Sequence, residues 1–372
     1  MGLILQIALP LVVLGLAVAF PILLSEVIGG WTKKYTSTVS FSAAKIPDLS
    51  GKVAIVTGAN TGIGYFSALE LARHGAEVIV ASRSMERGMA AVEKMKQDIA
   101  QTSTNVPSIT LLPLDLSSLE SVEKFAQEFL ALDKPLHILV NNAGVMKSPG
   151  SEFMGQEMTY GFETTQDGFE YHMGVNHIAH AYLTKLLGHK LQQSAPSRVV
   201  VVSSMAEQGS YESGFVFDDW APAVNGQMPE GYEDGKAYGQ SKLANLMFAK
   251  ELAERWQGTG VTAYALHPGV IVSELGRYME PHLEEQNQKL PWLQRVLGKL
   301  FMGLFQYALM STPDGALTQL HLATAPADQL VNGAFYHPIG KVVTPYHAQG
   351  SNATLQKLLW DETEKAMERR NS

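Results

Sequence analysis

Short apolar runs alternate with longer amphipathic segments along most of this chain. The runs are rich in valine, isoleucine and leucine, as in buried strands, and the longer segments repeat apolar residues at helical spacing. Regular alternation of strand and helix predicts an α/β fold with a doubly wound parallel sheet, covered by helices on both faces. The predicted strands are 53–57, 77–81, 108–114, 136–140, 198–203, 261–267 and 333–337, and the predicted helices are 65–74, 84–100, 119–132, 169–191, 236–256 and 362–370. The sheet is therefore predicted to have seven strands.

The first 30 residues form a segment of their own. From Gly2 to Leu24 the chain is apolar and uncharged apart from the polar Gln6, and about 20 such residues span a bilayer. A cleaved signal peptide would begin with a basic residue, and a buried helix of this length would carry a polar face. Residues 1–30 therefore predict a single-pass transmembrane helix, followed by a linker at 31–50. The basic pair 33–34 then places the rest of the chain in the cytosol, at the endoplasmic reticulum membrane in a eukaryotic cell.

Length and composition limit the remaining classes of function. The 372 residues allow one large α/β domain at 51–345 and a helical tail at 346–372. A net charge of −8 argues against nucleic acid as a partner, because a nucleic-acid surface needs a basic excess. The chain has no cysteine, and its 11 histidines show no metal-binding spacing, so no metal site is predicted.

The first predicted strand leads directly into a glycine-rich turn with the sequence TGANTGIG, residues 57–64. A strand, a glycine turn and a helix N-terminus together bring backbone N–H groups to a phosphate. Gly58 permits the tight turn, Gly62 lets the backbone approach a pyrophosphate, and Gly64 lets the helix pack on the strand. The motif indicates a dinucleotide site, although alone it also fits a glycine turn that binds nothing.

Four further residues could carry proton-transfer chemistry. Tyr238 and Lys242 lie four residues apart in a predicted helix and share one face, where an ammonium would favour the phenolate and lower its pKa. The same spacing also fits a surface pair. Ser204 follows a predicted strand and could hydrogen-bond a carbonyl oxygen, or simply cap a helix. Asn176 lies within a predicted helix, where asparagine is mildly unfavourable, and could order water for a proton relay.

Taken in this order, the motifs resemble the classical short-chain dehydrogenase/reductase family over roughly residues 51–340. Finer features resemble its retinol dehydrogenase branch and the related WW-domain oxidoreductase, although the sequence shows no WW domain. The resemblance implies a Rossmann fold and a nicotinamide-dependent oxidoreductase. The motifs are Thr57-Gly58-x-x-x-Gly62-x-Gly64, Asp115, Asn141-Asn142-Ala143-Gly144, Asp167-Gly168-Phe169-Glu170, Gly174-Val175-Asn176-His177, Ser204, Tyr238-x-x-x-Lys242, Ser241-Lys242-Leu243-Ala244-Asn245, His267-Pro268-Gly269-Val270 and Ser273-Glu274-Leu275.

The resemblance also implies a role for each residue of a catalytic tetrad. Tyr238 would exchange a proton with the substrate oxygen, and Ser204 would orient and polarise that oxygen. Lys242 would lower the tyrosine pKa and bind the nicotinamide ribose, and Asn176 would hold a water that connects Lys242 to solvent. The implied cofactor contacts are Gly58, Asn60, Thr61, Gly62, Ile63, Gly64, Ser82, Arg83, Asp115, Leu116, Asn142, Ala143, Gly144, Tyr238, Lys242, Pro268, Gly269 and Val270.

The end of the second predicted strand favours NADP(H) as the cofactor. In NAD-binding relatives of this fold, an acidic residue near this position binds the ribose 2′-hydroxyl. Here the strand ends Ala81-Ser82-Arg83, without a carboxylate. Arg83 can pair with a 2′-phosphate and Ser82 can hydrogen-bond it, although Arg83 could also only solvate the next helix.

Two segments leave their roles open. Residues 147–165 could form a lid over the nicotinamide side or a plain surface insertion. Residues 290–310 are strongly apolar and could pack in the core, line a pocket or make a second membrane contact. An apolar pocket wall and an anchor would together suit a lipophilic substrate that arrives from the bilayer.

The sequence thus predicts a membrane-anchored, NADP(H)-dependent oxidoreductase that interconverts a carbonyl and an alcohol. Its substrate would be lipophilic, of the retinoid, steroid or long-chain aldehyde type. One alternative is a non-catalytic NADP-binding scaffold or sensor, and another is an NADPH reductase of a lipid or pigment intermediate. The lack of cysteine disfavours a protochlorophyllide-reductase-like role. A homodimer is left open.

Overall fold

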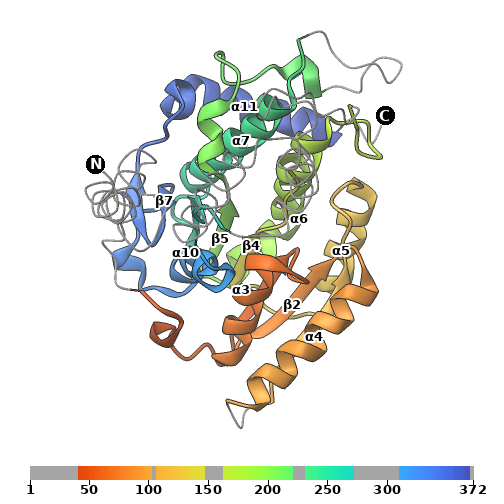
Figure 1. The fold of residues 1–372 in the computed structure, drawn as a ribbon, viewed down its shortest axis with the longest axis vertical. Helices are drawn as coiled ribbons and strands as arrows, with labels where there is room; N and C mark the ends of the chain where they lie inside the picture. The colour runs from red at the N-terminus through yellow and green to blue at the C-terminus, as the bar shows by residue number, and fades with distance from the viewer. Residues whose placement is uncertain (1–40, 103–105, 147–161, 221–230, 272–309, 369–372) are drawn as a thin grey trace, which may run out of the picture.

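A sheet of eight strands forms the centre of the molecule, with helices on both faces (Figure 1). The computed structural model describes residues 41–102, 106–146, 162–220, 231–271 and 310–368. The strand order is β3-β2-β1-β4-β5-β6-β7-β8, so the chain reverses direction across the sheet between β1 and β4. In such sheets ligands bind beyond the carboxyl ends of the strands at this reversal. The strands are β1 (Val53–Thr57), β2 (Glu77–Ser82), β3 (Ile109–Pro113), β4 (Ile138–Asn141), β5 (Ser197–Val202), β6 (Val261–Leu266), β7 (Phe335–His337) and β8 (Lys341–Val343).

Two helical layers cover the sheet. Helices α3, α4 and α10 pack on one face, whereas α5, α6 and α7 pack on the other, where α11 lies against α7. The main helices are α3 (Gly62–Arg73), α4 (Met85–Ala100), α5 (Leu119–Ala131), α6 (Ala179–Gln193), α7 (Asp234–Arg255), α10 (Thr312–Thr324) and α11 (Ala353–Glu368). The short turns are η1 (Ala43–Lys45), η2 (Met173–Ile178), η3 (Met205–Gly209), η4 (Phe217–Trp220), η7 (Ala327–Gln329) and η8 (Ala348–Ser351).

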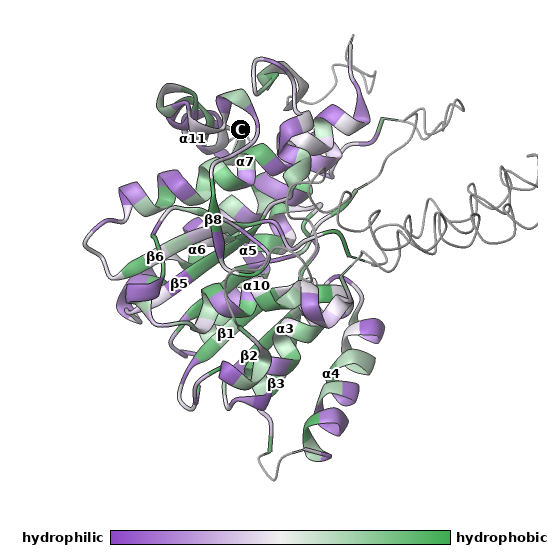
Figure 2. Cartoon of the chain, turned by 60° about the vertical axis from the view of Figure 1, so that its left-hand side comes forward, coloured by the Kyte–Doolittle hydropathy of each residue, from purple (hydrophilic) through white to green (hydrophobic). Residues whose placement is uncertain are grey.

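Strand β1 shows why the sheet could be predicted from apolar runs. Its alternate residues Val53 and Ile55 join the core under α5, α6 and α7. Ala54 and Val56 join the opposite core under α3, α4 and α10. All four side chains are buried, because both faces of the sheet are covered. Figure 2 shows the same pattern, with hydrophobic strands inside and hydrophilic residues on the outer helices.

The predicted α/β fold is confirmed, but the prediction of seven parallel strands is wrong. An eighth strand, β8, pairs antiparallel with β7, with His337 opposite Lys341 and Phe335 opposite Val343. The strand has only three residues, and Lys341 and Val342 are exposed. A short edge strand without a buried face leaves no apolar run in the sequence, which is why it was missed.

Two predicted helices differ from the structure in an informative way. The helix predicted at 169–191 contains the π-helical turn η2 before α6. The tail helix predicted at 362–370 begins at Ala353 in the structure. This helix packs against the rest of the molecule, because Leu359 and Met367 are buried against the core. Its charged outer face dominated the sequence pattern.

Three sequence predictions concern residues outside the described ranges. These are the membrane anchor at 1–30, the insertion as far as residue 161, and the apolar segment as far as residue 309. Among the described residues, no helix is both long and apolar enough to cross a membrane. The anchor therefore stays a prediction.

Candidate active site

The glycine-rich turn after β1 makes room at the end of the sheet. Gly58 and Gly62 both have left-handed φ angles, of 65° and 61°, which favour glycine. A Cβ atom at Gly64 would lie 2.3 Å from the Asn142 Nδ2 atom, and one at Gly58 would lie 3.0 Å from the Ala143 Cα atom. At Gly62, by contrast, no atom lies within 4 Å of such a Cβ. The turn therefore packs tightly against Asn142 and Ala143 at Gly58 and Gly64, and it is open at Gly62.

The first turn of α3 suits an anion. Its N-cap residue Thr61 makes no side-chain capping bond, and no acidic residue lies in the first turn. The N-terminal N–H groups of a helix carry partial positive charge and bind phosphate. Ile63 contributes its backbone here, while its side chain packs against the α3-side core. The residues from Gly58 to Gly64 therefore fit the pyrophosphate of a dinucleotide.

The end of β4 is tied to the end of β1. The backbone N–H groups of Asn142 and Ala143 both donate to the Thr57 Oγ1 atom, at 2.9 Å each. The Asn142 side chain donates from Nδ2 to the Thr57 carbonyl at 2.7 Å. A Cβ atom at Gly144 would lie 3.3 Å from the Lys242 Nζ atom. Residues 142–144 therefore contact both the glycine-rich turn and the predicted catalytic lysine.

Asn176 lies in the π-helical turn η2 and is completely buried. Its Oδ1 atom accepts from the Val145 N–H group at 2.8 Å. Its Nδ2 atom donates to the Val145 carbonyl and to the Ser241 Oγ atom, both at 3.0 Å. Turns of this π type occur often at functional sites. Asn176 thereby joins the loop after β4 to the helix that carries Tyr238 and Lys242.

Ser204 and Tyr238 lie together at the start of α7. Ser204 caps η3 by accepting from the Ala206 N–H group at 3.1 Å, and its side chain lies near enough to the Tyr238 hydroxyl group to favour a lower pKa for it. A Cβ atom at Gly239 would lie 2.8 Å from the Ala206 carbonyl oxygen, so glycine permits this close approach of α7 and η3. The structure therefore brings the predicted serine and tyrosine into contact.

Burial dominates the protonation of Tyr238 and Lys242, the predicted acid/base pair. It raises the pKa of Tyr238 to about 12, although the nearby Ser204 side chain favours a lower value. Burial also lowers the pKa of Lys242 to about 8. The Lys242 Nζ atom lies 5.6 Å from the centroid of the Tyr238 ring and donates to the Val202 carbonyl at 3.3 Å. At neutral pH both groups hold their protons, and the lowering of the tyrosine pKa by Lys242 stays a prediction.

The other predicted cofactor residues lie at the carboxyl ends of the neighbouring strands. At the end of β2, Arg83 is exposed and Ser82 donates to the Ser84 carbonyl at 3.2 Å. After β3, the Asp115 Oδ1 atom accepts from the Ser117 N–H and hydroxyl groups at 2.9 and 2.7 Å, which fixes the turn into α5. Leu116 in that turn is buried. The predicted residues at this edge are Ser82, Arg83, Asp115 and Leu116.

The segment after β6 completes the edge. Gly269 has a φ angle of 98°, which again favours glycine, and it follows Pro268. The Val270 carbonyl accepts from the Met310 N–H group at 2.9 Å, and this bond fixes the backbone next to the site. The structure therefore gathers all predicted site residues along the carboxyl edge of one sheet.

The structure also places here several polar residues that were given no role in the predicted site, although Glu170 and Asn245 lie within the family motifs. Glu170 is completely buried and accepts from the His172 Nδ1 atom at 2.7 Å and from the Tyr232 hydroxyl at 2.9 Å. The His172 ring packs edge-on against the Tyr238 ring, with their centroids 5.9 Å apart. His180 and Asn245, on α6 and α7, are also buried. The available signal in the sequence was a polar residue on an otherwise apolar helix face. His180 lies four positions after Asn176, and Asn245 lies three positions after Lys242.

Comparisons with known proteins agree with this geometry. The family model described as short chain dehydrogenase matches residues 52–217. Retinol dehydrogenase 11 of Homo sapiens is 39% identical over 329 residues, which cover 88% of this chain and 89% of that protein. Retinol dehydrogenase 12 of Mus musculus is 40% identical over 329 residues, with the same shares of 88% and 89%.

Solved structures show the same fold. The crystal structure of an uncharacterized protein from Mycobacterium paratuberculosis is 27% identical, with a TM-score of 0.63, and the match covers 89% of this chain and 98% of that one. The Pseudomonas aeruginosa RhlG/NADP complex is 23% identical, with a TM-score of 0.55, and the match covers 79% of this chain and 96% of that one. The chain thus belongs to the short-chain dehydrogenase family of oxidoreductases, in the retinol dehydrogenase branch.

Proposed function

We propose that this protein is an NADP(H)-dependent oxidoreductase that interconverts a carbonyl and an alcohol on a lipophilic, retinoid-like substrate. The observation that carries the proposal is the contact of Ser204 with Tyr238 beside Lys242, next to a glycine turn shaped for a pyrophosphate. The relatives named retinol dehydrogenase support the substrate class.

The side chains of the site have distinct roles in this proposal. A bound nicotinamide supplies or takes the hydride. Ser204 donates a hydrogen bond to the substrate oxygen and polarises the carbonyl. Tyr238 protonates that oxygen during reduction, and burial suits this role because it keeps the phenol protonated at neutral pH. The charged Lys242 stabilises the phenolate that remains, and Asn176 orients α7 through Ser241.

The preference for NADP(H) rests on the end of β2. The described residues there include no carboxylate that could bind a ribose 2′-hydroxyl, because residues 78–85 contain no Asp or Glu. The Arg83 side chain is exposed at the same place. A guanidinium in this place pairs well with a 2′-phosphate. Arg83→Glu should raise the Kd for NADPH at least about ten-fold, as one lost charge-assisted contact predicts, and should lower the Kd for NADH, because the new carboxylate can bind the ribose 2′-hydroxyl. Equal affinities of the wild type for NADPH and NADH would remove this argument.

The reaction itself is tested with a panel of lipophilic aldehydes, ketones and alcohols, followed by the absorbance of NADPH. We expect turnover of retinoid-like members by the wild type and loss of turnover in Tyr238→Phe, with NADPH binding retained. The loss should be about 10²–10⁴-fold, the usual contribution of a general acid. A wild type that binds NADPH but turns over no member would instead support a non-catalytic scaffold.

A further inference from the structure

A buried histidine outside the predicted tetrad links the two halves of the site. His180 lies in the first turn of α6, is only 2% exposed, and has both ring nitrogens within hydrogen-bond distance of a partner. Its Nδ1 atom lies 3.0 Å from the Asn176 carbonyl oxygen, and its Nε2 atom lies 2.9 Å from the Thr57 Oγ1 atom. Thr57 ends β1, while Asn176 belongs to the catalytic π turn.

The partners fix which nitrogen carries the proton. A carbonyl oxygen only accepts, so the Nδ1 atom must donate to Asn176. Burial lowers the pKa of His180 to about 4, and the nearby charge of Lys242 acts in the same direction, so the ring is neutral at pH 7. The Nε2 atom of this neutral ring is therefore an acceptor, and it takes the hydrogen of the Thr57 hydroxyl group.

The Thr57 hydroxyl group is then fully used. Its oxygen accepts from the N–H groups of Asn142 and Ala143, at 2.9 Å each, and its hydrogen goes to His180. The other available acceptor, the Val140 carbonyl, lies farther away at 3.4 Å. Because Gly58 packs directly on Ala143, this one hydroxyl group holds the backbone on which the pyrophosphate turn rests.

We propose that His180 is a positioning residue, which holds the cofactor-binding turn through Thr57 and the catalytic turn through the Asn176 carbonyl. The inference rests on the proposed function, because it assumes that the glycine turn binds NADPH. It adds a residue that contacts neither cofactor nor substrate and that fixes the distance between the two binding elements. Loss of the Thr57 bond should loosen the turn and weaken NADPH binding, while loss of the Asn176 bond should affect turnover.

Two substitutions separate these effects, because each one replaces only one of the two ring nitrogens. His180→Gln keeps a polar group near the Nε2 position and can still accept from Thr57. His180→Asn keeps a donor near the Nδ1 position and can still reach the Asn176 carbonyl. His180→Leu keeps neither. His321 of α10 is the control, because its side chain is also buried but its ring packs edge-on against Phe41 on the other face of the sheet.

The first measurement needs no cofactor. In protein labelled with ¹⁵N-histidine, we expect His180 to be the Nδ1–H tautomer and to stay neutral from pH 8 to pH 5. An Nε2–H tautomer, or a ring that is charged at pH 6, would overturn the network. This measurement stays informative even if the wild type binds no NADPH, an outcome that would refute the proposed function alone.

The second measurement is the Kd for NADPH by fluorescence, with the Tm of each variant as a check on folding. We expect His180→Leu to raise the Kd roughly ten-fold, as one lost buried hydrogen bond predicts, and His180→Gln to restore most of it. His180→Asn should bind NADPH as weakly as His180→Leu, and His321→Gln should bind it like the wild type. The double variant that combines Thr57→Val with His180→Leu should have a Kd for NADPH no higher than that of the weaker-binding single variant.

Other outcomes contradict the proposal. If the double variant loses affinity additively, the two side chains do not act as one unit. If His180→Asn binds NADPH like the wild type, the Thr57 bond does not hold the turn. If His180→Leu fails to fold, the Kd values of His180→Gln and His180→Asn for NADPH still test the proposal. A histidine with only a structural role would give the same Kd in both variants, whereas the proposal expects tighter binding by His180→Gln.

Discussion

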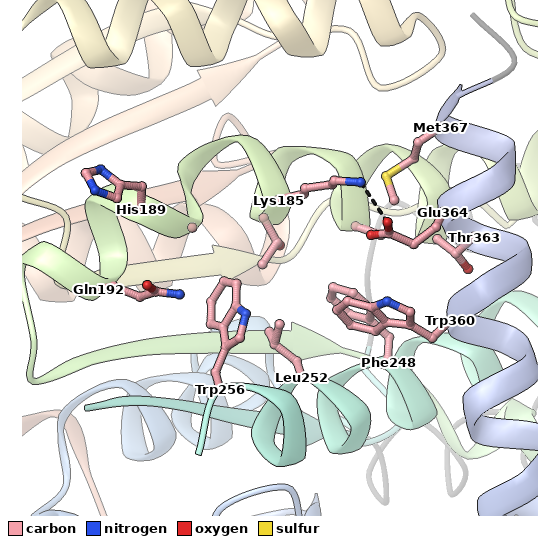
Figure 3. Close-up of a pocket in the computed structure, with 13 residues that line it drawn as sticks. Lys185, His189, Gln192, Phe248, Leu252, Trp256, Trp360, Thr363, Glu364 and Met367 are labelled. Atoms are coloured by element: carbon pink, nitrogen blue, oxygen red, sulfur yellow. Dashed lines mark hydrogen bonds and ion pairs between the residues drawn. The ribbon is translucent and has the colours of Figure 1, made fainter. Parts of the chain in front are cut away.

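The two ends of helix α7 have opposite character. Near its beginning lie polar groups of the candidate site, with Lys242 on the helix and Asn176 bonded to Ser241. Near its end, α7 encloses a mainly apolar pocket of about 350 Å³ together with α6 and α11 (Figure 3). Trp256 and Leu252 of α7 and Trp360 of α11 line it, and Lys185 pairs with Glu364 across its rim.

The two ends are held together by different forces. At the site, buried polar groups depend on specific partners, and removal of one partner leaves another unsatisfied. At the pocket, stacked rings dominate: Phe248 lies parallel to Trp360 with centroids 5.6 Å apart, and the Arg255 guanidinium lies 4.6 Å from the Trp360 ring. From this difference we expect substitutions at the beginning of α7 to change activity and substitutions at its end to change stability.

Substitution of Lys242 should give the largest effect and separate the two properties. Lys242→Met removes a buried ammonium group but keeps the volume of the side chain, so turnover should fall about 10²–10⁴-fold while the free energy of unfolding stays equal or rises. Steady-state kinetics and urea unfolding measure both. Lys236→Met, at a half-buried position of the same helix where the side chain pairs with Glu233 at the surface, is the control and should change neither property appreciably. A marked loss of stability in Lys242→Met would contradict the comparison.

Substitution of Trp360 should show the reverse. Trp360→Ala removes the ring between Phe248 and Arg255, and the free energy of unfolding should fall by about 2–3 kcal/mol, less than for a fully buried tryptophan. The kcat and KM of the folded enzyme should stay near wild-type values at a temperature well below Tm. Leu358→Ala, at an exposed position of the same helix, should have a smaller effect on stability. A large loss of kcat in Trp360→Ala would show that the pocket end supports catalysis directly.

The pH dependence of stability gives the smallest of the three effects. Burial lowers the pKa of His177 to about 3, whereas an unfolded histidine titrates near 6.5, so the unfolded chain takes up the proton first as the pH falls. Stability is therefore full above pH 6.5 and is lost as the pH falls from 6.5 toward 3. His177→Gln should make this loss less steep by up to about 1.4 kcal/mol per pH unit. Urea unfolding between pH 7 and pH 5, compared with the exposed His189→Gln, measures the change; equal slopes would contradict the assignment.

The parts of the site that could be predicted are those that depend on nearby residues. The glycine-rich turn and the pair Tyr238 and Lys242 each lie within a short stretch of the chain, so their spacing alone indicates their geometry. The regular strand and helix pattern likewise predicted a doubly wound parallel sheet. The predictions hold where local chemistry and the fold agree.

The parts that could not be predicted join distant residues. His180 meets Thr57 across 123 positions, and Asn142 meets Thr57 across 85. No periodicity in the sequence indicates which buried histidine faces the sheet and which faces α11. The short strand β8 and the inner face of α11 were missed for a related reason, because an exposed or charged outer face dominates their sequence pattern.

The position of α11 has a consequence for the synthesis of the protein. Its residues Ala353–Glu368 follow all eight strands in the chain, yet Thr363 bonds His177 of η2, and Gln356 bonds the buried Glu251 at 2.8 Å. A nascent chain that has already formed its sheet would therefore still expose Phe248 and the neighbouring apolar surface of α7 until α11 has been made. A premature stop just before Ala353 would leave that surface uncovered permanently. Such a product would retain every predicted catalytic residue and still be a substrate for chaperones and proteases rather than an enzyme.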